Sequence, residues 1–328
     1  MPRPEPVPRS LRVAAFALSF ASLATVQLVV RRPAILAERF VTHGGWVELT
    51  ALAAYAAWLI GKLHPVRATG VWRARLWLLF SVVFFAQLVL GLAGFSRFLM
   101  TGVLHLPVPA MIVGGPLYRG AGLFMPILLA VTLVLVGPAW CSYLCYIGAW
   151  DLWLARRRKR PVPLPRWRNL ARAGTLVMVA GVALGCRALG VSGEAAAAAG
   201  GAFGLLGVGV MATLSRRTGA MVHCTAYCPI GLVATVAGKL SPFRLRIASG
   251  CDACGACATV CRFDALSPAD IAARRPASSC TLCGDCLKTC RGRLLEYRFL
   301  RLAPARARAL FLVLVVSLHA LFLGVARI

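Results

Sequence analysis

Acidic residues are scarce in this chain: ten Asp and Glu stand against 37 Lys and Arg among 328 residues, and charged residues of both signs make up 14%. Apolar residues make up 59%, well above the roughly 45–50% that is usual in a soluble domain. This balance excludes an ordinary soluble protein. Because the charged residues fall in bursts between long apolar runs, we predict a mainly α-helical, polytopic membrane protein.

Three further absences narrow the range of possible functions. The sequence contains no C-x-x-C-H, which excludes covalent c-type haem at the level of motifs. Its basic residues are not interleaved with aromatic residues in the stripes that stack on bases, so the net charge of +27 does not indicate a nucleic-acid partner. Polar residues inside the apolar runs are few, which argues against a transporter energised by redox chemistry.

Apolar runs of about 20 residues predict the membrane helices. The second run is the weakest because Glu48 lies near one of its ends, so the number of spans is six or seven. The sixth run is rich in alanine and glycine, which would permit close helix packing. The runs cover residues 11–30, 45–61, 76–95, 122–140, 169–189, 195–214 and 309–326.

The distribution of basic residues predicts the orientation. With the N-terminus inside, the cytoplasmic segments hold 30 of the 37 Lys and Arg residues. Basic residues accumulate in cytoplasmic loops and also face anionic lipid, so we predict a multi-pass protein of the cytoplasmic (inner) membrane with membrane lipid as a partner. The predicted parts are an N-terminal transmembrane region (1–121), a transmembrane core (122–242), a cytoplasmic module (243–300) and a C-terminal transmembrane helix (301–328).

Cysteine is abundant, and its spacing carries the strongest signal. Twelve of the 13 cysteines fall into four clusters, and Cys186 stands alone in an apolar run, where we expect it to be core packing. Close C-x-x-C spacings in a chain that is not secreted indicate metal binding rather than disulfides.

Two of the clusters have the spacing C-x2-C-x2-C-x3-C, which is a ferredoxin-type motif. Zinc ribbons use pairs of C-x2-C separated by a longer gap and fit poorly, whereas soft thiolates at this spacing suit a [4Fe–4S] cluster. In two-cluster ferredoxins the fourth cysteine of each run ligates the other cluster. We therefore predict one cluster on Cys251, Cys254, Cys257 and Cys290, and a second on Cys280, Cys283, Cys286 and Cys261.

Arginine replaces the proline that usually follows the fourth cysteine of such a run, at Arg262 and at Arg291. The proline is not a ligand, so its loss does not remove the clusters. A nearby positive charge favours the more negative, reduced cluster, and we expect these arginines to raise the reduction potential.

The other two clusters are the C-x3-C pairs in "CSYLCYIG" (141–148) and "CTAYCPIG" (224–231), each following an apolar run. Positions i and i+4 share a face of an α-helix, so each pair would present two thiols together. Three interpretations stay open: a joint metal centre, which includes an iron–sulfur cluster; thiol–disulfide or copper chemistry; and simple buried thiols. We predict a redox or metal site at Cys141, Cys145, Cys224 and Cys228.

The combination of paired C-x3-C motifs and two ferredoxin-type motifs over residues 120–295 resembles the NapH/NosR/CcoG-type membrane ferredoxins. These proteins carry C-x3-C-P motifs at the cytoplasmic ends of membrane helices; "CTAYCP" matches, whereas "CSYLCY" has Tyr146 in place of proline. The resemblance implies an electron-transfer subunit, not a stand-alone catalyst, working between the quinone pool or other redox subunits and a redox partner. The alternative is an accessory, maturation or redox-sensing factor for a metalloenzyme.

Several isolated polar residues are weaker candidates. His64 and His105 are candidate contacts for a quinone or haem, His319 is a candidate haem ligand without an evident second histidine, and Glu48 is a candidate proton relay. Residues of these types at such places are more often ordinary interface or packing groups. Asp151 is expected to cap a helix or to pair with the basic block at 156–160.

Overall fold

The computed structural model describes residues 7–30, 33–99 and 106–325, and they are mainly helical. The described residues form two compact units. In one unit, the helix near the C-terminus packs with the helices near the N-terminus. In the other, residues 106–301 join the two C-x3-C pairs to the ferredoxin-type motifs. His105 lies outside the described residues.

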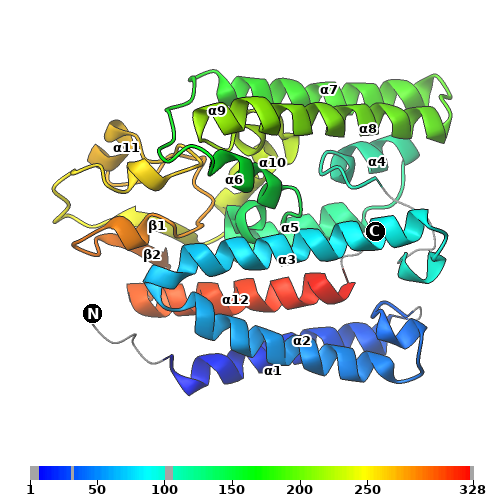
Figure 1. Ribbon diagram of the computed structural model, residues 1–328, viewed down its shortest axis with the longest axis horizontal. Helices are drawn as coiled ribbons and strands as arrows, with labels where there is room; N and C mark the ends of the chain where they lie inside the picture. The colour runs from blue at the N-terminus through cyan, green and yellow to red at the C-terminus, as the bar shows by residue number, and fades with distance from the viewer. Residues whose placement is uncertain (1–6, 31–32, 100–105, 326–328) are drawn as a thin grey trace. The chain divides into compact units, whose positions relative to one another are not determined.

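The first unit is a helical bundle in which α1, α2 and α12 contact one another (Figure 1). Its apolar core includes Leu23, Leu49 and Val325. A Cβ atom on Gly324 would lie 2.7 Å from Cδ2 of Leu23, so the glycine allows the two helices to approach closely. The elements are α1 (Arg9–Val29), η1 (Ala37–Arg39), α2 (Gly44–Leu63), α3 (Val66–Leu92), η2 (Ser96–Phe98) and α12 (Pro304–Val325).

Three candidate polar residues have packing or hydrogen-bonding roles in this bundle. Glu48 accepts a hydrogen bond from the Ala37 N–H at 2.6 Å. The carbonyl oxygen of His64, which follows α2, accepts a 2.7 Å hydrogen bond from the Arg308 guanidinium. His319 is fully buried in α12, with its ring 5.9 Å from that of Tyr55.

Six helices in the described part are long and apolar enough to cross a membrane, which is the lower of the two predicted numbers. The helix α2 is not one of them; among its 20 residues are Glu48 and Lys62, and charged residues are costly in a bilayer. The six are Arg9–Val29, Val66–Leu92, Phe124–Leu144, Arg168–Ala188, Gly193–Thr218 and Pro304–Val325.

The second unit contains the remaining helices and a two-stranded sheet. In it, α7 contacts α4 and α10. Its helical elements are α4 (Met111–Arg119), α5 (Phe124–Val136), η3 (Gly137–Ala139), η4 (Trp140–Leu144), α6 (Gly148–Ala155), α7 (Arg168–Ala188), α8 (Gly193–Val210), η5 (Met211–Ser215), α9 (Arg216–Thr218), η6 (His223–Tyr227), α10 (Pro229–Ala237), η7 (Gly238–Leu240), η8 (Ala258–Val260), α11 (Pro268–Ala272) and η9 (Leu287–Thr289).

The two strands of the sheet flank the ferredoxin-type motifs along the chain. Strand β1 (Phe243–Ile247) precedes the first motif, and β2 (Leu295–Phe299) follows the second (Figure 1). The strands are antiparallel, with Phe243 opposite Phe299 and Ile247 opposite Leu295. Alternate residues are buried, as expected for strands with one covered face. The sheet therefore brings together the two ends of the segment that carries eight cysteines.

The glycine-rich helix α8 makes a close contact at Gly207. A Cβ atom on Gly207 would lie 2.7 Å from Cε1 of His223. Glycine at this position therefore lets α8 lie directly against the turn that carries the second C-x3-C pair.

Candidate metal centres

The two ferredoxin-type motifs follow the same backbone path. In each, a short 3-10 helix, η8 or η9, lies between the third and the fourth cysteine. Left-handed backbone conformations recur at matching places, at Ala253 and Leu282 (φ 57° and 56°) and at Gly255 and Gly284 (φ 72° and 77°). The cysteine repeat in the sequence is thus also a repeat in conformation.

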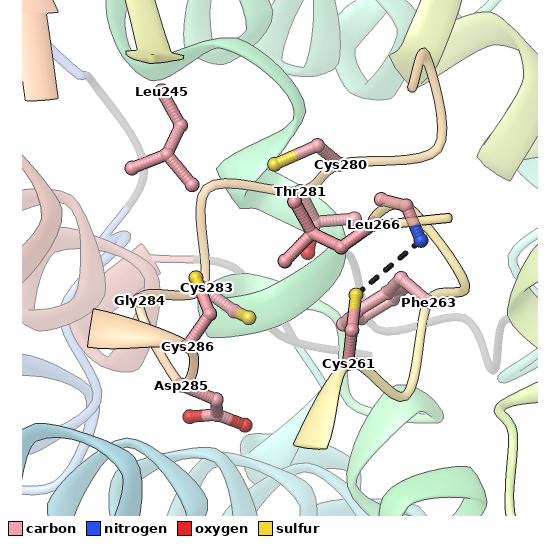
Figure 2. A pocket seen from close by; sticks show the side chains of 11 residues that line it. Leu245, Cys261, Phe263, Leu266, Cys280, Thr281, Cys283, Gly284, Asp285 and Cys286 are labelled. Atoms are coloured by element: carbon pink, nitrogen blue, oxygen red, sulfur yellow. Dashed lines mark hydrogen bonds between the residues drawn. The ribbon is translucent and has the colours of Figure 1, made fainter. Parts of the chain in front are cut away.

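One cavity is lined by the thiols of Cys280, Cys283 and Cys286 from the second motif and by Cys261 from the first. Figure 2 shows these four side chains distributed around the cavity, together with Phe263, Leu266 and Asp285. The structure therefore brings together the four residues that the sequence assigns to one cluster. Four soft donors in an apolar surrounding fit a [4Fe–4S] cluster.

Burial changes the acidity of these thiols. It raises the pKa of Cys280 to about 11 and also raises the pKa of Cys286, with the neighbouring thiols of Cys283 and Cys261 adding to the rise. The protein alone thus holds these groups as neutral thiols. Because metals bind the thiolate, metal loading must release their protons.

The other four ferredoxin-type cysteines lie nearer to solvent. Burial raises the pKa of Cys257, and the thiols of Cys251 and Cys254 add to this rise. Cys254 is exposed. The fourth, Cys290, accepts a 3.2 Å hydrogen bond at Sγ from the Leu294 N–H.

The same N–H···S bond occurs in the cavity of Figure 2, where Cys261 Sγ accepts from the Ala265 N–H at 3.3 Å. Leu294 also connects the second motif to the start of the first, because its carbonyl oxygen accepts from the Ala248 N–H at 2.8 Å. Hydrogen bonds to cysteine sulfurs help to set the potential of an iron–sulfur cluster, and both fourth cysteines have one.

The C-x3-C pairs lie on π-helical turns, which corrects the expectation of an α-helix. The turns are η4 and η6. Each is closed by a hydrogen bond from the second cysteine to the residue five positions earlier, from Cys145 N–H to Trp140 O (3.0 Å) and from Cys228 N–H to His223 O (2.7 Å). A π-turn holds one extra residue per hydrogen-bonded ring, is rare, and is frequent at functional sites.

The two turns differ directly after the second cysteine. Pro229 begins α10 immediately after Cys228, as expected for proline at the first helical position. In the first motif Tyr146 stands there, a turn follows, and α6 begins at Gly148. The replacement of proline by Tyr146 therefore delays the following helix by two residues and leaves the cysteine turn intact.

All four C-x3-C thiols line a second cavity. Cys141, Cys145 and Cys228 are buried and Cys224 is half-buried. In the part of the chain that the structure describes, no group of three or more His, Cys, Asp or Glu side chains is arranged to hold one metal ion. Four thiols around one cavity are the kind of donor set that a [4Fe–4S] cluster uses.

Asp151 connects the two C-x3-C turns. It belongs to α6, after the first pair, is fully buried, and its Oδ2 accepts a 3.0 Å hydrogen bond from the Cys224 N–H in the second pair. Burial raises the pKa of Asp151 to about 6. Sequence reasoning predicted a helix cap or a partner for the basic block, and it missed this link because the contact crosses 73 residues.

Arg172 is the second residue whose position the sequence did not reveal. In the charge pattern it is one of many basic residues, yet it is 2% exposed in the first turns of α7. Its guanidinium acts electrostatically on the thiols of Cys141, Cys228 and Cys224. One feature of the sequence could have indicated a functional role: Arg172 stands at the start of a predicted span, and ionisable residues inside spans tend to be functional.

Two hydrogen bonds join the first C-x3-C turn to the segment that lines the ferredoxin-type cavity. Ser142 Oγ donates to Thr281 O at 2.9 Å, and Tyr143 Oη donates to Cys283 O at 3.0 Å. Both donors stand between the cysteines of the first C-x3-C pair and are fully buried. In the second pair the matching hydroxyl, that of Thr225, bonds within its own turn to Met221 O. The first turn therefore bonds to the ferredoxin-type segment through these two side chains. In the second turn, the hydroxyl that corresponds to Ser142 makes no such bond.

Arg262 fastens the ferredoxin-type segment to the loops after α6 and α9. Its guanidinium donates to the carbonyl oxygens of Ala155 (3.2 Å), Arg158 (2.8 Å), Lys159 (3.0 Å) and Gly219 (2.6 Å). Next to it, Asp264 pairs with Arg168 and accepts from the Leu164 N–H at 3.0 Å. The arginine that replaces proline thus has a docking role, beside the predicted effect of its charge.

Comparison with known families gives one match, to a family model described as a 4Fe-4S binding domain, in two copies at residues 118–164 and 200–248. Each copy contains one C-x3-C pair, and both copies end before Cys251. No curated protein and no solved structure matches the chain. The chain therefore carries a 4Fe–4S binding domain, and its matched parts are those that form the cavity of Cys141, Cys145, Cys224 and Cys228.

Proposed function

We propose that the protein is a membrane-bound iron–sulfur electron-transfer protein, which relays electrons between the quinone pool or a membrane partner and a redox partner. The observation that carries this proposal is the pair of hydrogen bonds from Ser142 and Tyr143, which stand between two of the C-x3-C thiols, to the segment that lines the cavity of the ferredoxin-type thiols. An electron relay requires redox sites that are close to one another, and these bonds hold the two thiol-bearing segments together.

Three sets of thiols would hold the cofactors. When bound, a [4Fe–4S] cluster supplies one-electron transfer. The C-x3-C set would hold a centre in addition to the two that the ferredoxin-type motifs predict. The sets are Cys251, Cys254, Cys257 and Cys290; Cys261, Cys280, Cys283 and Cys286; and Cys141, Cys145, Cys224 and Cys228.

The exposure of the three sets supports an order. The first set includes the exposed Cys254 and is the one that a soluble redox partner can approach. In the second set Cys286 is buried and the other three cysteines are half-buried, and the segment that carries them contacts the first C-x3-C turn. That turn lies at the end of the apolar helical run Phe124–Leu144, where a quinone or a membrane partner would meet the protein. The excess of basic residues in the same segments supports a cytoplasmic location for the exposed set.

Electron exchange with a quinone tests the proposal. The purified protein in lipid nanodiscs is reduced anaerobically with dithionite and mixed with a short-chain quinone, while the visible absorbance of the clusters is followed. We expect rapid reoxidation of the wild-type protein and of Cys186→Ser, which removes the isolated cysteine of α7. We expect at least about tenfold slower reoxidation when Cys141 and Cys224 are both changed to serine, with the ferredoxin-type clusters still reducible.

Two results would overturn the proposal in different parts. Equal rates in all three proteins would show that the C-x3-C set is not on the route. A wild-type protein that gives no electrons to the quinone or to a membrane fraction from its own cell would exclude the relay and favour the maturation role, in which a client metalloenzyme becomes metal-deficient when the gene is deleted.

A further inference from the structure

Arg172 places a buried cation beside the C-x3-C thiols. Its guanidinium is 2% exposed, and its Nη1 lies 3.5 Å from the position that a Cβ on Gly231 would take. Gly231 lines the same cavity as the four thiols. The guanidinium is therefore at the wall of this cavity, on a helix that carries none of the four cysteines.

The hydrogen bonds of Arg172 leave its charge without full compensation. Nη2 donates to the Asn169 amide oxygen at 2.6 Å, and Nε has no hydrogen-bond partner among the described residues. A neutral amide does not balance a positive charge, and a buried charge without a counter-charge is strongly destabilising. One turn earlier on α7, Arg168 is balanced by Asp264.

The thiols of this cavity are the groups that can supply a counter-charge. Helix α7 packs against η6, which carries Cys224, and against α10, which begins directly after Cys228. Four thiolates around an iron–sulfur core form a net anion, and such an anion is the counter-charge that the guanidinium lacks in the protein alone.

We propose that Arg172 is the buried counter-charge of the centre held by Cys141, Cys145, Cys224 and Cys228, and that its guanidinium raises the reduction potential of this centre. The proposal rests on the proposed function in so far as it takes these thiols to bind a cluster. An electron that arrives at this site adds negative charge next to a fixed positive charge in a water-poor environment, where charge interactions are strong. Reduction is therefore favoured, and the electron has no need of an accompanying proton.

An EPR-monitored potentiometric titration of the full-length protein tests this role. The signal of the centre is identified by its loss in the Cys141→Ser/Cys224→Ser protein. In Arg172→Gln we expect the reduced fraction at a fixed potential to fall by about tenfold, which equals 59 mV for a one-electron couple. Arg172→Lys keeps the charge, so we expect it to retain the iron and to have a much smaller shift. Arg187→Gln, at the exposed far end of α7, is the matched control and should not shift.

Iron content separates an electrostatic role from a purely structural one. Loss of the centre in Arg172→Gln with retention in Arg172→Lys would support the counter-charge. An unchanged potential in an iron-replete Arg172→Gln protein, or equal loss of iron in both variants, would overturn it. Failure of the relay itself is seen separately, because it abolishes quinone reoxidation of the wild-type protein and does not depend on Arg172.

Discussion

The phenolic oxygen of Tyr143 donates a 3.0 Å hydrogen bond to the carbonyl oxygen of Cys283, which joins the first C-x3-C turn to the neighbouring thiol cavity. Tyr143 is fully buried and stands two residues after Cys141. The contact makes the first turn structurally distinct from the second, although both belong to copies of the same 4Fe-4S binding domain.

Tyr143→Phe tests whether this contact couples the two sites. The variant leaves the Cys283 carbonyl without this donor, so we expect a loss of about 1–2 kcal/mol of stability and a severalfold slower reoxidation by quinone at full iron content. Tyr227→Phe is the matched control, because Tyr227 lies in the second turn and donates to Phe203 O at 2.7 Å. It should lose similar stability in thermal unfolding but keep the wild-type rate. Equal slowing in both variants would contradict a specific coupling role for Tyr143.

Arg262→Ala tests the docking of the ferredoxin-type segment. Removal of its four contacts to backbone carbonyls should cost about 2 kcal/mol and make the chain around Cys251–Cys290 more sensitive to protease. Arg291 occupies the matching place after the second motif and is exposed. Arg291→Ala should therefore resist the protease as well as the wild-type protein does. Protection of both variants to the same extent would exclude the docking role.

The charge of Arg262 has a separate readout. If it also favours the reduced form of the nearby cluster, Arg262→Pro should lower the potential of that cluster in a redox titration. An unchanged potential would leave Arg262 with its docking contacts alone.

Asp151→Asn and Asp151→Leu distinguish the hydrogen bond of Asp151 from its charge. Asparagine still offers an oxygen to the Cys224 N–H, and it avoids burying a carboxylate whose pKa is raised to about 6. We expect Asp151→Asn to keep its iron and a stability no lower than wild type at pH 8, where the buried carboxylate would be ionised. Asp151→Leu leaves the Cys224 N–H unpaired and should lose iron from the C-x3-C site.

Asp252 provides the comparison for Asp151, since it also accepts a cysteine N–H, from Cys254 at 3.2 Å, but at an exposed place. Water can replace that acceptor, so Asp252→Leu should keep its iron. The iron content of both variants is measured on anaerobically purified protein. If Asp252→Leu loses iron and Asp151→Leu does not, the expectation is wrong.

The sequence predicts the features that depend on short-range pattern. The runs of apolar residues locate the six helices, and the cysteine spacing locates the repeated ferredoxin-type motifs, because both are determined by neighbours along the chain. The C-x3-C pairs were found in the same way. Their π-turns were not predicted, because the C-x3-C spacing is compatible both with an α-helix and with the wider π-turn, whose hydrogen bonds reach one residue further along the chain.

Contacts between distant segments could not be predicted from one sequence. Asp151 reaches Cys224, Arg262 reaches Gly219, and α12 packs with α1 and α2, and no local periodicity encodes these pairings. Arg172 was hidden for a different reason. Its neighbours on the N-terminal side are basic, so it resembled the end of a topology-setting loop, and its burial depends on how α7 meets the second cysteine turn.

Iron stoichiometry tests the central claim most directly. The number of irons per chain depends on whether the C-x3-C cavity binds a cluster in addition to the two ferredoxin-type sets. Iron and sulfide are measured on anaerobically purified protein, with EPR of the reduced state. We predict about twelve irons per chain, as three [4Fe–4S] clusters require, and about eight in the Cys141→Ser/Cys224→Ser protein. About eight irons in both proteins would show that Cys141, Cys145, Cys224 and Cys228 hold no cluster, and would contradict the account.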